Sequence, residues 1–176
     1  AVEFESFLTA NGRPLRLTAG EHVFRQGDEN RSFYLVREGL LKAYYSSSDG
    51  TESVKSFIQA GGFIGSLSAA FEGQGCSFSL VCLEPTDLLQ MDFETLYAAS
   101  RQHVEIAARL VDFLLAFAMK KERREMELLS LTAEDRYRLL LERTPELEQR
   151  VRQKDIARYL GITPVALSRI RARCKA

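Results

Sequence analysis

The distribution of glycine and proline divides this chain into two parts with different folding rules. Every glycine except Gly161 lies before residue 76, and neither glycine nor proline occurs from Phe93 until Pro145. Both residue types interrupt regular elements. The first part is therefore predicted to consist of short segments joined by turns, and the second to begin with a long helix.

Short apolar segments rich in β-branched and aromatic residues recur between the glycines. Short strands at this spacing predict a compact β-barrel or β-sandwich. The predicted strands are residues 15–17, 23–24, 33–36, 40–45, 54–58, 80–83 and 88–91.

The long helix carries an apolar seam. Apolar or small residues recur at alternate steps of four and three from Ala99, through His103, to Phe117, which is heptad-like spacing. The chain's own β domain could cover this seam, or the same helix of a second subunit could. We favour the second alternative, a homodimer, because Leu114, Leu115 and Ala118 add a second apolar face. The predicted dimer-interface residues are Ile106, Leu110, Phe113 and Phe117.

Charge is distributed unevenly although the net charge is zero. Residues 150–176 hold eight Lys or Arg and one acid, a net charge of +7, so residues 1–149 carry −7. A basic segment after an acidic body favours a polyanionic partner. On charge alone, a solvated pair of charged helices explains the segment equally well.

Residues 153–172 have the spacing of a helix-turn-helix. Ala157 is small where two helices would cross closely, and Gly161 suits the positive φ of a sharp turn. Thr163 is placed to cap the second helix, and Pro164 takes its first position, where proline costs nothing. The small core between the helices is predicted to be Ile156, Leu160, Leu167 and Ile170.

The second of these helices is expected to enter the major groove of DNA. Arg169 can pair bidentately with guanine, Ser168 can reach a base or a phosphate, and Val165 can contact a thymine methyl. Thr163 and the helix N-terminus could hold a phosphate. A purely structural helical hairpin is the alternative. The predicted DNA-binding residues are Thr163, Val165, Ser168, Arg169, Arg171 and Arg173.

Other function classes lack their chemistry in this sequence. Cys76, Cys82 and Cys174 fit no metal, redox or disulfide spacing, so we expect a reducing, cytoplasmic setting. No apolar stretch is long enough for a membrane span. His22 and His103 flank no acid–base pair, and no phosphate-binding loop or nucleophile motif occurs. We expect no enzyme activity, no catalytic residues and no metal site.

The order of elements resembles the Crp/Fnr family of bacterial transcription regulators over nearly the whole chain. The similar segments are residues 21–27, 33–39, 61–65 and 163–171. The resemblance implies an α+β fold: a cyclic-nucleotide-binding-like β-roll or jelly roll, a long helix, and a winged-helix-like helix-turn-helix. The β-wing that usually follows is absent from these residues. The implied domains are an effector-sensing β-roll (1–93), a dimerisation helix with hinge (94–129), and a DNA-binding domain (130–176).

The resemblance also implies partners. These are double-stranded DNA with a palindromic operator and a second copy of the chain, with RNA polymerase as a further candidate and no membrane. An effector would bind in the β-roll. The alternative is a cyclic-nucleotide-like regulatory module with no DNA-binding role.

The family's cyclic-nucleotide cassette is altered in this chain. Ser66 stands in Gly65-Ser66-Leu67 where the family has Glu, and Cys76 precedes Ser77 where the family has Arg. The bidentate phosphate contact is therefore lost, which argues against tight cyclic AMP binding. Another small effector, or none, is favoured over cyclic AMP. The implied effector-binding residues are Gly65, Ser66, Leu67, Cys76 and Ser77, with Lys121 and Glu122 at the positions that would meet adenine.

Two further sensor types are disfavoured by the positions of the ligand residues. An iron–sulfur sensor needs about four cysteines, several of them near the N-terminus. No cysteine precedes Cys76. A haem sensor needs an axial ligand, and His22 and His103 are the only histidines.

Overall fold

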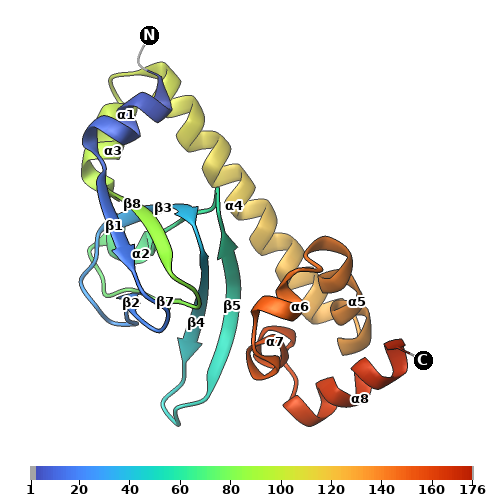
Figure 1. The fold of residues 1–176 in the computed structure, drawn as a ribbon. Helices are drawn as coiled ribbons and strands as arrows, with labels where there is room; N and C mark the ends of the chain where they lie inside the picture. The colour runs from blue at the N-terminus through green and yellow to red at the C-terminus, as the bar shows by residue number, and fades with distance from the viewer. Residues whose placement is uncertain (1–2, 176) are drawn as a thin grey trace.

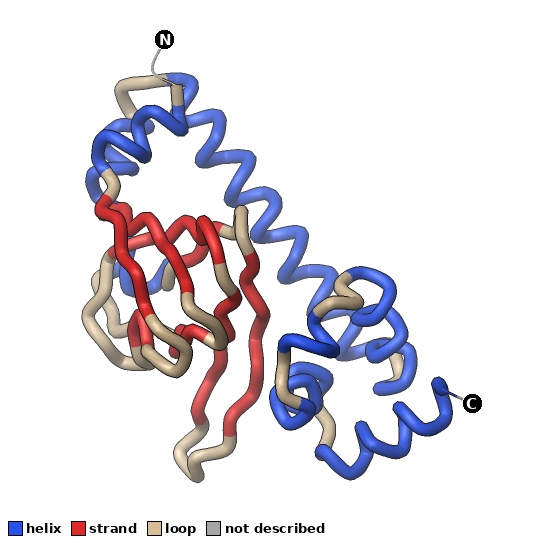
Figure 2. The backbone as a smooth tube through the Cα atoms, viewed as in Figure 1, coloured by secondary structure: helices blue, strands red, loops and turns tan. Residues whose placement is uncertain are grey.

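The computed structural model describes residues 3–175, and its elements run from a β-rich module through a long helix to a group of short helices (Figures 1 and 2). The predicted domains also include residues 1, 2 and 176, which lie outside the described residues. Among residues 3–175, no helix combines the length and apolarity needed to cross a lipid bilayer.

Two four-stranded antiparallel sheets form the β module. The first has the order β1-β8-β3-β6 and the second β2-β7-β4-β5. All seven predicted strands are present, and only the two-residue strand β6 was missed. The bounds are β1 (Arg13–Leu17), β2 (His22–Phe24), β3 (Ser32–Glu38), β4 (Leu40–Ser46), β5 (Glu52–Gln59), β6 (Phe63–Ile64), β7 (Ser79–Cys82) and β8 (Thr86–Asp92).

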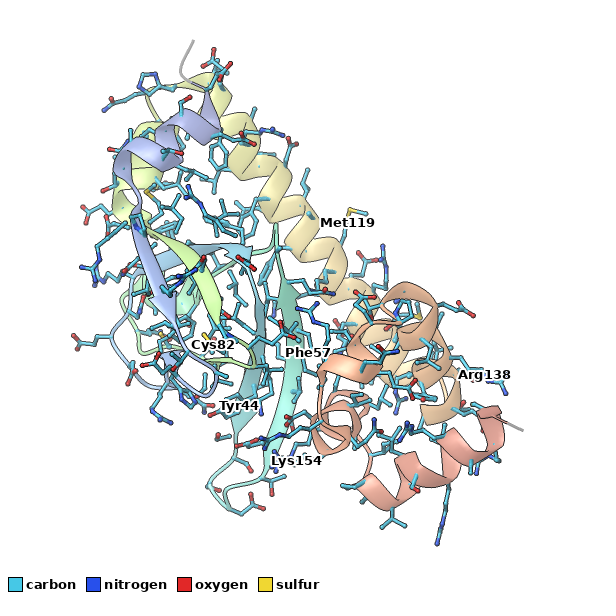
Figure 3. All side chains as sticks on the ribbon, in the orientation of Figure 1. Tyr44, Phe57, Cys82, Met119, Arg138 and Lys154 are labelled. Atoms are coloured by element: carbon cyan, nitrogen blue, oxygen red, sulfur yellow. The ribbon has the colours of Figure 1, made fainter. Side chains whose placement is uncertain are left out.

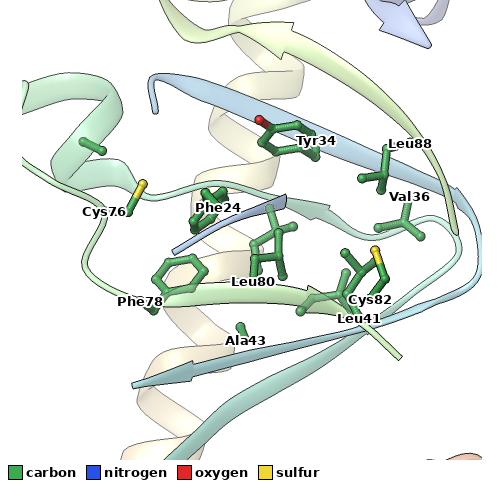
Figure 4. Packing of buried hydrophobic residues seen from close by; sticks show 13 residues of the cluster. Phe24, Tyr34, Val36, Leu41, Ala43, Cys76, Phe78, Leu80, Cys82 and Leu88 are labelled. Carbon is green, nitrogen blue, oxygen red and sulfur yellow. The ribbon is translucent and has the colours of Figure 1, made fainter. Parts of the chain in front are cut away.

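The core of the module lies between the two sheets. Aromatic rings occupy much of it, with Phe24 5.3 Å from Phe78 and 6.2 Å from Tyr34 between ring centroids. Leu41, Leu80 and their neighbours complete the packing (Figure 4). The α+β fold with an N-terminal β-roll is therefore confirmed.

The helix predicted to run on from residue 94 is broken. It consists of α3 (Phe93–Ser100) and α4 (Val104–Ser130). Between them His103 has φ −127° and ψ 114°, an extended conformation, and it serves as the N-cap residue of α4. Ala99 and His103 therefore do not belong to one continuous seam. Two shorter helices cover the β module, α1 (Phe4–Asn11) and α2 (Leu67–Glu72).

The predicted seam on α4 lies against the chain's own β module, and one of its residues is fully buried there. Ile106 is fully buried among residues of the chain's own β8 and α3, and Leu110 packs against the same cluster. The ring of Phe113 lies 4.9 Å from Phe63, and Phe117 stacks on Phe113. Ile106, Leu110 and Phe113 thus contact the chain's own β module, the first of the two alternatives above. Phe117 meets that module through Lys55 of β5, whose ammonium lies 5.3 Å from the centroid of its ring.

A second apolar face of α4 stays exposed. It includes Leu114 and Leu115, as the additional face in the sequence indicated, but it is longer than predicted. We call it the exposed α4 face and define it by the exposed apolar residues Val104, Val111, Leu114, Leu115, Met119, Met126 and Leu129.

The C-terminal module consists of four helices around a small core. They are α5 (Ala133–Arg143), α6 (Leu147–Arg150), α7 (Gln153–Leu160) and α8 (Pro164–Lys175). Thr132 caps α5 by accepting a hydrogen bond from the Asp135 N–H at 3.1 Å. The buried members of the core include Tyr137, Leu140, Leu147, Ile156, Ala157, Leu160, Leu167 and Ile170.

Helix α7 packs on the outer face of the second sheet, beside β5 (Figure 1). As a result every residue from Leu40 to Tyr44 in β4 is buried. Leu41 and Ala43 point into the β core, while Leu40 joins the core of the C-terminal module. Continuous burial of a strand indicates cover on both faces.

Candidate nucleic-acid interface and effector site

The turn between α7 and α8 depends on Gly161. Its φ of 71° and ψ of 32° lie in the left-handed region, and its N–H donates to the Ala157 carbonyl. A Cβ built on Gly161 would meet only Leu128, at 3.9 Å. Glycine is therefore required by backbone conformation rather than by lack of space.

The start of α8 matches the prediction. The Thr163 hydroxyl accepts a hydrogen bond from the Ala166 N–H at 3.1 Å, and Pro164 is the first helical residue. Beneath the turn, Ala157 is fully buried where α7 meets α8. The predicted core residues Ile156, Leu160, Leu167 and Ile170 are all buried.

The outward face of α8 is open to solvent. Val165 is 62% exposed, and Ser168 and Arg169 are exposed as well. Arg169 forms no ion pair among residues 3–175. Figure 1 shows α8 on the side of the C-terminal module away from the β sheets. This face offers one free guanidinium, one hydroxyl and one apolar side chain to a partner.

The other two predicted arginines are held by acids of the same module. Arg171 donates to Glu148 of α6 at 3.0 Å, and Arg173 donates to Glu134 of α5 at 3.0 Å. These pairs were not predicted, because each acid precedes its arginine by 23 or 39 residues in the chain.

A polar contact that was not predicted joins the C-terminal module to the β module. Lys42 of β4 donates to Asp155 of α7 at 3.0 Å, and Glu52 of β5 pairs with Arg158 of α7. Nearby, the Phe57 ring of β5 lies 5.4 Å from Tyr159 of α7. Figure 3 shows Phe57 on the side of the sheet that faces the C-terminal helices.

A second link lies at the edge of this contact. Arg150 of α6 donates two hydrogen bonds to the Glu84 carboxylate, at 2.7 and 2.8 Å, and a third to Gln59 at 3.0 Å. Because a bidentate pair fixes the relative orientation of its two groups, this contact also fixes how α6 sits on the β module.

Four of the predicted effector residues lie together in the β module. The Ser66 hydroxyl accepts from the Ser77 N–H at 3.1 Å and lies 3.4 Å from the Ser77 hydroxyl. Gly65 packs tightly, because an added Cβ would lie 2.8 Å from the Phe33 ring. Cys76 is buried in the core (Figure 4), and burial raises the pKa of its thiol. This cassette supplies hydrogen-bonding groups but no cation.

The other three predicted effector residues lie elsewhere. Leu67 lines an apolar cavity of about 190 Å³ between the first sheet, α3 and α4. Lys121 and Glu122 are exposed on α4, with the Lys121 ammonium 5.3 Å from the centroid of the Phe117 ring. No contact between them and the Ser66–Ser77 group is observed among the described residues.

The possible metal ligands lie apart from one another in the described part of the chain. No three His, Cys, Asp or Glu side chains gather there as a metal ion would require. The imidazole of His22 instead hydrogen-bonds the Tyr44 hydroxyl at 2.8 Å, and burial lowers the pKa of His22.

The chain is similar to a known protein family and to curated proteins. A family model described as the cyclic nucleotide-binding domain matches residues 14–103. The fumarate and nitrate reduction regulatory protein of Escherichia coli (strain K12) is 26% identical over 165 residues, which cover 88% of this chain and 65% of the relative. The chain thus spans about 65% of the length of the curated relatives it matches.

Solved structures share the fold. FixK2 from Bradyrhizobium japonicum has a TM-score of 0.79 at 19% identity, covering 92% of this chain and 83% of that chain. The c-di-GMP responsive global regulator CLP from Xanthomonas campestris has a TM-score of 0.73 at 24% identity, covering 97% and 89%. At these identities the likeness is one of fold.

Proposed function

The chain belongs to the cyclic nucleotide-binding domain family, as a member of its Crp/Fnr regulators, and on that premise we propose that it is a sequence-specific DNA-binding regulator of transcription. The observation that carries the proposal is the open face of α8. A capped helix that follows a left-handed glycine turn presents Val165, Ser168 and Arg169 to solvent. This is the geometry with which a recognition helix enters the major groove.

Each exposed side chain has a role that fits its chemistry. Arg169 reads guanine through two parallel hydrogen bonds, Ser168 bonds a base or a phosphate, and Val165 contacts a thymine methyl. Thr163 and the N-terminus of α8 hold a phosphate.

Arg173, and to a lesser extent Arg171, acts on the DNA backbone in this proposal. The Arg173 side chain is 58% exposed, so its pair with Glu134 is worth little and can be exchanged for a phosphate. The pair between Arg171 and Glu148 is less exposed and mainly fixes α8 on its module.

The proposed dimer forms through the exposed α4 face. Its apolar residues recur along one side of the helix and are exposed in the described chain, and Leu114 also borders the apolar cavity beside α3. In such a dimer a two-fold axis relates the two α8 helices. They would read an inverted repeat whose half-sites lie about 34 Å apart.

The proposed roles of the three segments follow their order in the chain. Residues 1–93 sense an effector, residues 94–129 join the subunits and act as a hinge, and residues 130–176 bind DNA. RNA polymerase is a candidate partner at the promoter, and the site of action is the cytoplasm. Cyclic AMP is disfavoured as the effector because the cassette lacks a cation at Cys76.

The test is selection of binding sites from random double-stranded DNA, followed by fluorescence anisotropy with the selected and scrambled sequences. We expect an inverted repeat to be selected and bound about a thousandfold more tightly than the scrambled one, with affinity falling as salt rises. Equal binding to both sequences would contradict the proposal and favour a regulatory module with no DNA-binding role.

A further inference from the structure

The last carbonyl groups of α7 are held by arginines from two other helices. The final carbonyls of a helix have no partner within it. In α7 the Tyr159 carbonyl accepts a hydrogen bond from Arg124 of α4, and the Leu160 carbonyl accepts one from Arg136 of α5 at 2.9 Å. Both guanidinium groups also place positive charge at the negative end of the helix dipole. The end of α7, immediately before the Gly161 turn, is therefore fixed from outside the helix-turn-helix.

Arg136 joins three helices with one side chain. One terminal nitrogen of its guanidinium bonds Leu160, and the other donates to the carbonyl of Leu131, the C-cap residue of α4, at 2.5 Å. The connection between α4 and α5 consists of Leu131 and Thr132. Because a guanidinium is planar and its N–H groups point in fixed directions, two bonds from it set the relative position of the two carbonyls. Arg136 thus fixes the ends of α4 and α7 relative to each other, where the chain enters the C-terminal module.

This arrangement is not the one that would stabilise the two arginines best. Within residues 3–175, neither Arg124 nor Arg136 forms an ion pair, and the buried Nε of Arg136 has no hydrogen-bond partner. Burial lowers the pKa of Arg124, and repulsion from Arg136 acts in the same direction. A buried N–H group without a partner costs free energy. Such local costs are expected where a residue serves function more than stability.

Helix α7 is held from its other side by the β module, and the two holds fix different things. The Lys42–Asp155 pair, at 3.0 Å, fixes α7 to the second sheet of its own subunit. Arg136 instead fixes α7 to the end of α4. The proposed dimer forms through the exposed α4 face, so α4 is the element along which the two subunits would meet. The angle between each helix-turn-helix and α4 therefore sets the distance between the two α8 helices of a dimer.

We propose that Arg136 is a positioning residue for DNA recognition, which sets the angle of the helix-turn-helix to the long helix and thereby the spacing of half-sites that the dimer reads. The inference rests on the proposed function. Arg136 acts through α7 and α8 and not on a base, because both of its terminal nitrogens donate to backbone carbonyls. A dimer gains affinity from two half-sites only if both recognition helices reach them at once. Loss of Arg136 should therefore weaken the coupling between half-sites and leave the contact with each half-site intact.

The test compares Arg136→Lys with the parent by fluorescence anisotropy on duplexes that carry a single half-site, the selected inverted repeat, or that repeat with its spacing lengthened or shortened. Lysine keeps the charge but cannot bridge two fixed carbonyls as a guanidinium does. We expect parent-like binding to the half-site, binding to the inverted repeat at least about tenfold weaker, and a reduced preference for one spacing. Arg138→Lys is the matched control and should behave as the parent on every duplex, because Arg138 lies on the same helix with its side chain 59% exposed.

A second measurement needs no DNA. Spin labels on Arg109→Cys in α4 and Ala172→Cys in α8 report the distance between these helices by double electron–electron resonance, since both positions are exposed. Cys174→Ser removes a further labelling site, and dilution with unlabelled chain isolates the distance within one subunit. The distance distribution should be narrow in the parent and in Arg138→Lys, and broader or displaced in Arg136→Lys.

The outcomes separate this inference from the proposed function. An unchanged distance distribution or a parent-like spacing preference in Arg136→Lys overturns the inference. An equal loss of binding to the half-site and to the inverted repeat also overturns it, because Arg136 would then act through the stability of the module. A parent chain that binds no selected sequence, while Arg136→Lys still broadens the distance distribution, refutes the proposed function and leaves the positioning of α8 by Arg136 in place.

Discussion

The ammonium group of Lys42 on β4 lies 3.0 Å from the carboxylate of Asp155 on α7, and the two side chains are only 10% and 4% exposed. The pair joins the β module to the first helix of the helix-turn-helix. Its partners are 113 residues apart in the chain. The orientation of the C-terminal module in this structure is therefore tied to a charge on the second sheet of the β module.

Asp155→Ala should destabilise the protein by about 3 kcal/mol in urea unfolding, because Lys42 would remain buried without its main partner. This loss of stability is at the lower end of the range for breaking a buried ion pair, because the Glu52 carboxylate remains 3.7 Å from the Lys42 ammonium. Asp112→Ala, at an exposed position on α4, is the control and should change stability by no more than about 0.5 kcal/mol. Equal stability of the two variants would show that the buried pair does not hold the modules together.

Arg169→Ala should weaken binding to the selected operator by about 1–3 kcal/mol and relax the preference at one base pair. Its guanidinium has no ion pair among the described residues to lose, so the fold should be unaffected. Arg101→Ala, at an exposed position at the end of α3, should bind DNA like the parent. Fluorescence anisotropy with the operator and its single-base variants measures both effects. If Arg169→Ala discriminates between these sequences as the parent does, Arg169 does not read a base.

Leu115→Glu should convert the proposed dimer into a monomer. The side chain is 57% exposed in the single chain, so a charge there costs the fold little but would be buried unpaired between two copies of α4. Arg109→Glu, exposed on the same helix outside the apolar face, should leave the dimer intact. Sedimentation measures the mass of each variant; a dimer that survives Leu115→Glu would place the interface elsewhere.

Lys55→Met should stabilise the protein at pH 7 by about 1–3 kcal/mol, at 1.36 kcal/mol per unit of pKa shift. Burial holds the pKa of Lys55 near 8, below its ordinary value of 10.5. Between these two values the unfolded chain binds a proton that the folded chain does not, so the parent gains stability as pH rises. The advantage of the variant should therefore shrink from pH 8 to pH 10.5 in urea unfolding, and a constant difference would contradict the depressed pKa.

Gly161→Ala should lower stability by about 1–2 kcal/mol, because an alanine pays the penalty of the left-handed region. The nearest atom to the added Cβ is 3.9 Å away, so no clash contributes. Gly161→Asn should cost less, since asparagine tolerates that conformation. Thermal unfolding of the two variants measures the difference in their stability. Equal losses of stability would indicate a steric cause instead of a conformational one.

Local signals in the sequence were enough to predict the strands and the helix-turn-helix. The glycine at the turn, the threonine cap and the first-position proline each act within a few residues, so their effect does not depend on the rest of the fold. The same is true of the seven strand segments. Only β6, with two residues, lacked enough sequence to be recognised.

The partners of surfaces could not be predicted in the same way. A period of apolar residues shows that a helix face is buried, but not what buries it, and so the face of α4 that includes Ile106 was assigned to a second subunit instead of the β module. The buried Lys42 was missed for a related reason. Its acid lies on a distant helix, and nothing near it in sequence indicates burial.

The burial of β4 on both faces has a consequence for how the chain unfolds. Its inner side chains belong to the β core, and Leu40 belongs to the core of the C-terminal helices. The strand therefore contributes side chains to the hydrophobic cores of both modules. If β4 separates from either module, apolar surface of the other module becomes exposed as well. Hydrogen exchange at the β4 amides should then report cooperative opening of both modules together rather than of one domain at a time.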